Sequence, residues 1–173
     1  VFHAEDETDM TFLGIIAFLD PPKPDAKEAI HGLYDAGVHV KVISGDAPVV
    51  VEHVCKLVGM KVGEQNAVTG SDLEKMSEEE LSRVVEKNDI FARLSPMQKQ
   101  RVVDALRKNG HVVGYMGDGV NDAPSLHDAD VGISVDNATD VAKASADIIL
   151  LEKSLTVILN GIYEGRRIYG NIL

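Results

Sequence analysis

Cysteine and the large aromatic residues are scarce in this chain of 173 residues. It has a single cysteine, Cys55, and no tryptophan, and aromatic residues make up only 5% of the sequence. One cysteine excludes an internal disulfide and an all-cysteine zinc site, and it is compatible with a reducing compartment. We expect Cys55 to be a small buried residue of a helix rather than a reactive thiol.

Positive charge is also scarce. The chain has 17 lysine and arginine residues and 28 aspartate and glutamate residues, which gives a net charge of −11. Proteins that bind nucleic acids displace counterions with an excess of positive charge, so DNA and RNA are not expected partners. A cation, or a nucleotide that carries a cation, is a more suitable ligand for a chain with this negative net charge. The hydrophobic and charged fractions, 45% and 26%, are those of a globular protein, and the length suits one domain or one domain with an appendage.

Long hydrophobic runs are absent. No apolar stretch approaches the roughly 18 residues that a helix needs to cross a bilayer. The longest, residues 12–19, contains Gly14 and ends at Asp20-Pro21-Pro22. The acidic N-terminus does not resemble a signal peptide, and Val1 is not a start methionine. We therefore interpret the chain as a soluble segment of a longer protein.

Short apolar segments alternate with segments of helical period. The strands predicted in this way are residues 11–19, 38–43, 90–92, 111–116, 131–135 and 147–151. The helices predicted between and after them are residues 25–37, 50–58, 77–85 and 95–109, a short helix on either side of strand 131–135, and a helix from Ser154 onward. Residues 61–77 have no clear period and are interpreted as an irregular surface insertion.

Strands separated by helices predict an α/β fold with a mostly parallel sheet and helices on both faces, in three layers. Sites in such folds lie at the carboxyl ends of the strands. Two polar loops follow strands there, Ser44-Gly45-Asp46 and Gly117-Asp118-Gly119. We expect these loops to converge on one pocket at the same edge of the sheet.

The residues from Gly117 to Pro124 carry the strongest chemical signal. Two glycines allow a sharp turn, and Asp118, Asn121 and Asp122 offer oxygen ligands of the kind that Mg²⁺ prefers. A single Asp-Gly pair would more often be an acidic turn, with Asp122 capping the next helix. The complete string after an apolar strand favours the metal site.

Phosphate chemistry is suggested by weaker signals. The Ser44 hydroxyl and nearby backbone amides precede a helix, where they could hold a phosphoryl oxygen or simply cap the helix. Lys99 could neutralise a transferring phosphoryl group. Taken alone, Lys99 and Arg93 are equally compatible with solvated surface positions.

Together these segments resemble a known family. The ordered set Asp20-Pro21-Pro22-Lys23, Ser44-Gly45-Asp46, residues 93–99 and residues 117–124 is similar to the phosphorylation domain of P-type cation-transporting ATPases, a haloacid-dehalogenase-like (Rossmann-like) fold. The similarity covers essentially the whole chain. The combination of Asp20-Pro21-Pro22-Lys23 with residues 109–111 and 130–136 is most similar to the bacterial magnesium-transporting subfamily.

The resemblance implies a role for each matching residue. Asp118 would hold the catalytic Mg²⁺, with Asn121 and Asp122 supporting the phosphate and the metal shell. Ser44 would hydrogen-bond the aspartyl phosphate, with Gly45 offering its amide. Asp46 would organise the loop on the nucleotide side. Lys99 would contact the phosphorylated aspartate, and Arg93 would reach the nucleotide, ATP. Asp20 and its prolines would form a hinge.

The chain also departs from the family pattern. It contains no Asp-Lys-Thr-Gly-Thr string, so the nucleophilic aspartate and its strand are expected to come from elsewhere in the polypeptide. Residues 1–153 would be the C-terminal part of the phosphorylation domain, and residues 154–173 the start of the stalk helix. The partners would be the nucleophile strand and the nucleotide-binding, actuator and membrane domains of the same polypeptide, at the cytoplasmic face of the plasma membrane.

The leading hypothesis is therefore a segment of a P-type ATPase that transports a cation, Mg²⁺ by the subfamily resemblance, through a phosphoaspartate. Without the nucleophile, the isolated chain should be inactive. One alternative is a soluble haloacid-dehalogenase-type phosphatase, which would need its own nucleophile strand. The other is a non-catalytic module that binds Mg²⁺ or a nucleotide.

Overall fold

Parallel strands form the centre of the molecule. A computed structural model describes residues 11–14, 21–60, 67–152 and 154–172. The strands of the first sheet, in the order β1-β3-β2, are β1 (Val42–Ile43), β3 (Ile90–Ala92) and β2 (Val68–Thr69). Those of the second, in the order β4-β5-β6, are β4 (Gly114–Met116), β5 (Val131–Val135) and β6 (Ile148–Leu150). Every pairing between these strands is parallel, which confirms the predicted parallel α/β fold.

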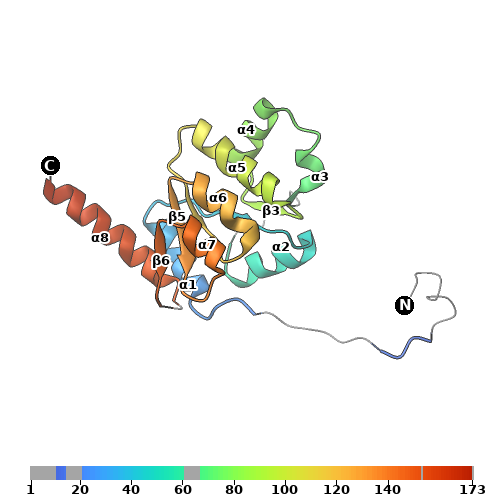
Figure 1. The fold of residues 1–173 in the computed structure, drawn as a ribbon, viewed down its shortest axis with the longest axis horizontal. Coiled ribbons are helices and arrows are strands. Elements are labelled where there is room, and N and C mark those ends of the chain that lie inside the picture. Colours follow the sequence, from blue (N-terminus) through green and yellow to red (C-terminus); the bar gives the residue numbers. More distant parts are fainter. Residues whose placement is uncertain (1–10, 15–20, 61–66, 153, 173) are drawn as a thin grey trace.

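Helices follow the strands as predicted (Figure 1). Their bounds are α1 (Ala26–Asp35), α2 (Pro48–Leu57), α3 (Gly70–Leu73), α4 (Glu78–Lys87), α5 (Pro96–Lys108), α6 (Ala123–Asp128), α7 (Asp140–Ser145) and α8 (Thr156–Ile172), with a 3₁₀ turn, η2 (Val120–Asp122), before α6. The N-termini of α4 and α5 carry capping boxes, Ser77 with Glu80 and Ser95 with Gln98. These side chains satisfy the first free backbone N–H groups, which is why both helices begin where the sequence predicted.

Strand β3 lies between two layers of the hydrophobic core. Its side chains alternate between two faces and are all buried. Phe91 packs into a cluster with α4 and α5, whereas Ile90 and Ala92 pack into a second cluster with α1 and α2. Cys55 lies in that second cluster at 1% exposure, and burial raises the pKa of its thiol to about 11, as expected for a structural residue. Helices therefore cover both faces of the first sheet.

The two sheets lie next to each other. A third cluster, centred on Val103, Tyr115 and Leu126, packs on the second sheet. Ile43 of β1 and Val113, just before β4, contact both this cluster and the cluster of α4 and α5. Within the described residues, β1 pairs with β3 alone and β4 with β5 alone. The strands β1 and β4 thus present the unpaired inner edges of two half-sheets, where the sequence had predicted one sheet.

Several strand predictions were too long. The segment 38–43 forms a strand at Val42–Ile43 alone, and 111–116 at Gly114–Met116 alone. Each strand is only as long as its pairing, since β1 pairs with β3 at residues 42–43 and β4 pairs with β5 at residues 114–116. Residues 11–14 have no regular structure, and the rest of the predicted strand 11–19 lies outside the described residues.

The interpretation of residues 61–77 as an irregular surface insertion is wrong for their second part. Residues 61–66 lie outside the described residues, but β2 and α3 occupy 68–73. Leu73 is completely buried in the cluster of α4 and α5. A two-residue strand and a four-residue helix are too short to create a hydrophobic period, so the sequence pattern could not reveal them.

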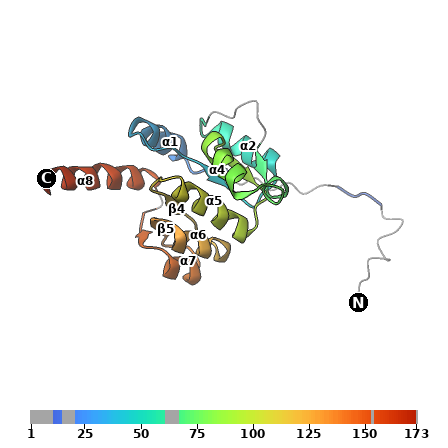
Figure 2. The same cartoon turned by 90° about the horizontal axis from the view of Figure 1, so that it is seen from above.

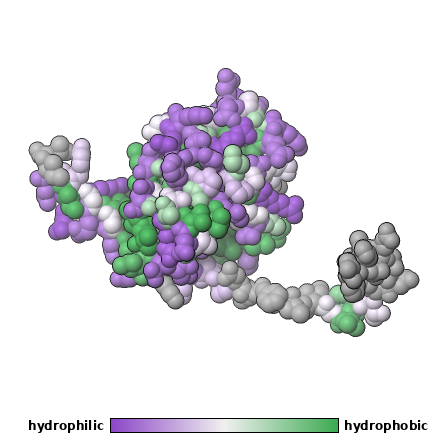
Figure 3. Space-filling model, in the orientation of Figure 1, coloured by the Kyte–Doolittle hydropathy of each residue, from purple (hydrophilic) through white to green (hydrophobic). Residues whose placement is uncertain are grey.

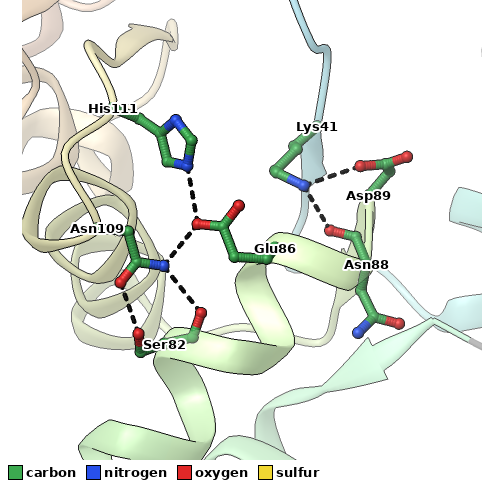
Figure 4. A network of polar contacts seen from close by, with 7 residues as sticks. All are labelled: Lys41, Ser82, Glu86, Asn88, Asp89, Asn109 and His111. Carbon is green, nitrogen blue, oxygen red and sulfur yellow. Dashed lines mark hydrogen bonds and ion pairs between the residues drawn. The ribbon is translucent and has the colours of Figure 1, made fainter.

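A polar network ties the end of α4 to the end of α5 (Figure 4). The amide of Asn109 donates to the Ser82 carbonyl at 2.9 Å and to Glu86 Oε1 at 2.6 Å, and the Ser82 hydroxyl donates to Asn109 Oδ1. His111 Nε2 lies 2.8 Å from the same Glu86 oxygen. Nearby, Lys41 Nζ donates to the Asn88 carbonyl and to Asp89. The contacts of Asn109 and His111 hold the ends of α4 and α5 together, and those of Lys41 join the end of α4 to the segment before β1.

Helix α8 extends from the body as a separate rod with the C-terminus at its far end (Figures 1 and 2). Its first turns pack on α1, where Leu159 lies against Gly32. Apolar side chains also gather on one face of the body near β6 (Figure 3), where Ile148, Ile149 and Leu151 are exposed. Among the described residues, no helix is both long and apolar enough to cross a bilayer.

Candidate functional site

The Ser44–Asp46 loop follows β1 and is tied to the loop that follows β3. Ser44 N–H donates to the Phe91 carbonyl at 2.9 Å, and the Ser44 carbonyl accepts from Leu94 N–H at 3.0 Å. Within the loop, the Ser44 hydroxyl accepts from Asp46 N–H and donates to the Asp46 carboxylate, both at 3.0 Å. The structure thus brings Ser44 and Asp46 together and fixes the Ser44 hydroxyl at the carboxyl end of β1.

Arg93 lies in the second of these loops. Its backbone N–H donates to the Asp46 carbonyl at 2.9 Å, and its side chain is exposed. Its φ angle of 54° lies in the left-handed region, which costs energy for a residue with a β-carbon. This conformation keeps the chain against the Ser44–Asp46 loop just before it enters the first turn of α5, which carries Lys99.

Lys99 and Asp122 form a largely buried ion pair. Lys99 Nζ lies 2.7 Å from Asp122 Oδ1, and the two side chains are only 12% and 13% exposed. Such a charge-assisted hydrogen bond is strong because little water competes for it. The pair joins the first turn of α5 to the Gly117–Pro124 loop, so both predicted loops lie against the start of α5.

Tyr115 is the third member of this group. It lies in β4, two positions before the Gly117–Pro124 loop, and is 7% exposed. Its hydroxyl donates to Asp122 Oδ1 at 2.9 Å, the oxygen that also accepts from Lys99. Gly119 N–H donates to the other oxygen at 3.3 Å. Asp122 therefore accepts from three elements at once.

The protonation states follow from these contacts. Burial raises the pKa of Asp122, but the hydrogen bonds from Lys99 and Tyr115 lower it by more, so the net pKa lies below its usual value. Burial, followed by the negative charge of Asp122, raises the pKa of Tyr115 well above its usual range. At neutral pH Asp122 is therefore ionised and Tyr115 is a protonated donor.

Gly117 makes room for the Asp122 side chain. A β-carbon at position 117 would lie 2.5 Å from Asp122 Cβ and 2.8 Å from its Cγ, which is far inside van der Waals contact. Only glycine lets the chain pass this close to the carboxylate. The first glycine of the loop is thus required by the packing of Asp122.

Asp118 and Asn121 differ from Asp122 in their surroundings. Both residues are exposed, and within the described residues neither side chain makes a hydrogen bond or ion pair. The Asp118 backbone is held in place, since its carbonyl accepts from Thr139 N–H at 3.0 Å and from the Thr139 hydroxyl. A fixed backbone with a free carboxylate and a neighbouring amide is a donor set that suits Mg²⁺.

Comparison with known proteins agrees with the fold. The family model of the haloacid dehalogenase-like hydrolases matches residues 2–130, most of the chain. The chain belongs to the haloacid dehalogenase-like hydrolase family. This family has the parallel α/β architecture described above, which confirms the fold predicted from the sequence.

Within this family the chain is similar to P-type cation ATPases. It is 55% identical over 169 residues to a magnesium-transporting ATPase, P-type 1, of Salmonella typhimurium and 50% identical over 172 residues to the protein of that name from Escherichia coli K12. A calcium-transporting ATPase of Bacillus subtilis is 40% identical over 167 residues. These alignments cover 96–99% of the chain but only 18–19% of the relatives.

A solved structure supports the same assignment. The catalytic domain of the CPx-ATPase CopB-B superimposes with a TM-score of 0.61 at 28% identity, covering 82% of this chain and 45% of that one. The predicted resemblance to P-type ATPases, with the magnesium-transporting proteins among the most similar, is thus confirmed. The chain spans less than a fifth of the length of these magnesium-transporting relatives.

The structure brings some of the predicted site residues together and leaves others apart. Lys99 and Asp122 lie together, as do Ser44 and Asp46, whereas Asp118, Asn121 and the Arg93 side chain point to solvent. Tyr115 was missed, because a tyrosine in an apolar strand looks like an ordinary core residue. The one available signal was its place two residues before the Gly117–Pro124 loop.

Proposed function

We propose that this chain supplies the Mg²⁺-binding and phosphate-stabilising part of the phosphorylation domain of a P-type ATPase that transports Mg²⁺. The parent protein would hydrolyse ATP through a phosphoaspartate. The observation that carries the proposal is the buried Lys99–Asp122 pair beside the free carboxylate of Asp118. The 55% identity to a magnesium-transporting ATPase supports the transported ion.

The residues of the site would have separate roles in binding the phosphoryl group or Mg²⁺. Lys99 presents a cation that Asp122 holds in place, so it can neutralise a phosphoryl oxygen without reorganising. The hydroxyl of Ser44 and the amide of Gly45 would donate to another oxygen of the same group. Asp118 and Asn121 would hold Mg²⁺, which when bound shields the negative charge of the phosphoryl group.

Asp122 is better suited to orienting Lys99 than to coordinating Mg²⁺ directly. Its Oδ1 already accepts from Lys99 and Tyr115, and its Oδ2 accepts from Gly119. We therefore assign the direct carboxylate ligand to Asp118 and the orientation of Lys99 to Asp122. Arg93 and Asp46, joined through their backbones, would line the side that faces the nucleotide.

The attacking aspartate would enter between the two half-sheets. The inner edges of β1 and β4 have no partner among the described strands, although Ile43 and Val113 bring them into one core. A strand from the remainder of the polypeptide could pair with both edges and deliver its carboxyl end between Ser44 and Asp118. The same polypeptide would supply the nucleotide-binding, actuator and membrane domains.

We further propose that residues 154–173 begin the stalk towards the membrane domain and that the site faces the cytoplasm. The projection of α8 away from the body supports this assignment (Figure 1). The chain spans only 18–19% of the length of the magnesium-transporting relatives, which leaves ample sequence for such domains.

The proposal is tested by phosphorylation of the full-length protein. Incubation with radiolabelled ATP and Mg²⁺ should give an acid-stable label, and Asp118→Ala should abolish it. Asp136→Ala serves as a control, because Asp136 is a carboxylate outside the two loops. An unchanged label in Asp118→Ala would refute the assigned metal ligand.

A phosphatase remains the competing function, since the matching family model describes hydrolases in general. Turnover of p-nitrophenyl phosphate by the 173-residue chain alone would favour it. We expect no turnover, because covalent catalysis needs a nucleophile that the chain does not contain in a recognisable motif.

A further inference from the structure

Tyr115 has a buried hydroxyl group that core packing alone does not require. Its ring belongs to the third cluster, with Val103 and Leu126 as neighbours, and phenylalanine would fill that space equally well. A buried tyrosine hydroxyl needs a hydrogen-bond partner, and this one donates to the carboxylate that also accepts from Lys99.

The Asp122 carboxylate can rotate unless it is held from more than one side. Gly119 N–H contacts Oδ2 at 3.3 Å, a long hydrogen bond, whereas Tyr115 contacts Oδ1 at 2.9 Å from a rigid strand. Lys99 approaches Oδ1 from α5 on a flexible side chain with several rotatable bonds. The rigid donor in this arrangement is therefore Tyr115.

We propose that Tyr115 is a positioning residue, whose hydroxyl fixes the Asp122 carboxylate in the orientation that holds Lys99 Nζ at the site. Loss of this hydroxyl lets the carboxylate turn and Lys99 swing towards solvent. The consequence for phosphoryl transfer rests on the proposed function, whereas the consequence for Lys99 does not.

Competitive acetylation of the full-length protein tests the positioning. Lysine reactivity is measured by mass spectrometry, with Lys41, which pairs with Asp89 elsewhere (Figure 4), as the internal reference. Tyr115→Phe should raise the acetylation of Lys99 relative to Lys41 about fivefold, as expected for the loss of one hydrogen bond. Tyr163→Phe, which removes an exposed hydroxyl on α8, should leave the ratio unchanged. An unchanged ratio in Tyr115→Phe overturns the proposal.

A second variant guards against a loss of folding, which would raise the reactivity of Lys41 as well. Asp122→Asn should also expose Lys99, and adding Tyr115→Phe to it should raise the ratio no further, because the tyrosine acts through Asp122. Additive effects of the two substitutions would overturn the proposal.

Phosphorylation kinetics separate this proposal from the proposed function. Tyr115→Phe should slow formation of the acid-stable phosphoenzyme about fivefold and leave the ATP concentration for half-maximal rate unchanged. If the wild-type protein forms no phosphoenzyme, the proposed function fails while the acetylation result still decides the role of Tyr115. A normal rate with exposed Lys99 would refute the catalytic consequence.

Discussion

Asp25 caps the start of α8, although the two are separated by 129 positions in the sequence: its carboxylate accepts from the Ser154 hydroxyl at 2.7 Å. It also accepts from the backbone N–H groups of Leu155 and Thr156. At the other end of α1, Arg166 donates to the Ala36 carbonyl at 2.7 Å. The Asp25–Leu155 and Ala36–Arg166 contacts both span 130 positions. The start of α1 therefore lies beside the start of α8 and its end lies further along α8, so the two helices run in the same direction.

The first prediction concerns this cap. Asp25→Ala should cost about 1 kcal/mol at the α1–α8 contact, because it leaves free donors at the start of α8. Hydrogen exchange should accelerate in the first turns of α8 and stay unchanged in α5. Asp35→Ala, an exposed carboxylate at the far end of α1, is the control. Equal protection of α8 in wild type and Asp25→Ala would contradict the capping role.

The second prediction is a pH dependence of the same contact. The hydrogen bond from Ser154, aided by those from Leu155 and Thr156, lowers the pKa of Asp25 despite the opposing effect of burial. The folded state thus favours the ionised form, so the stabilisation is complete above the usual carboxyl pKa and is lost as the pH falls through the lowered value. The difference in urea unfolding free energy between wild type and Asp25→Asn should therefore shrink below about pH 4. A constant difference would argue against this linkage.

The third prediction tests backbone packing in the second half-sheet. A β-carbon at Gly132 in β5 would lie 2.4 Å from the Leu126 carbonyl oxygen, a backbone atom that cannot move aside. Gly132→Ala should therefore destabilise the fold by about 2 kcal/mol or more. Gly114→Ala in β4 is the matched control, since its β-carbon would meet the Val131 carbonyl oxygen at an ordinary 3.8 Å. Thermal unfolding of both variants distinguishes the two outcomes, and similar midpoints would show the prediction to be wrong.

The sequence predicted those elements whose signals are local. The helix starts at Ser77 and Ser95 and the apolar strand 131–135 were predicted at nearly their observed positions. Elements that depend on tertiary partners were not. The strand predicted at 111–116 is shorter because its partner β5 begins at Val131, opposite Gly114, and α3 was missed because four residues show no period. Likewise, the pairing of Lys99 with Asp122 across 23 positions depends on how α5 lies against the loop.

The fourth prediction separates the two carboxylates of the Gly117–Pro124 loop. Asp122→Ala leaves Lys99, whose side chain is 12% exposed, without its partner, so the fold should lose about 2 kcal/mol. Asp118→Ala removes an exposed carboxylate that holds no other described side chain, so stability should stay within about 0.5 kcal/mol while Mg²⁺ affinity falls. Urea unfolding without metal, followed by Mg²⁺ titration calorimetry on the same samples, measures both effects. Equal destabilisation by the two substitutions would mean that Asp118 is structural, and the division between metal ligand and positioning residue would have to be abandoned.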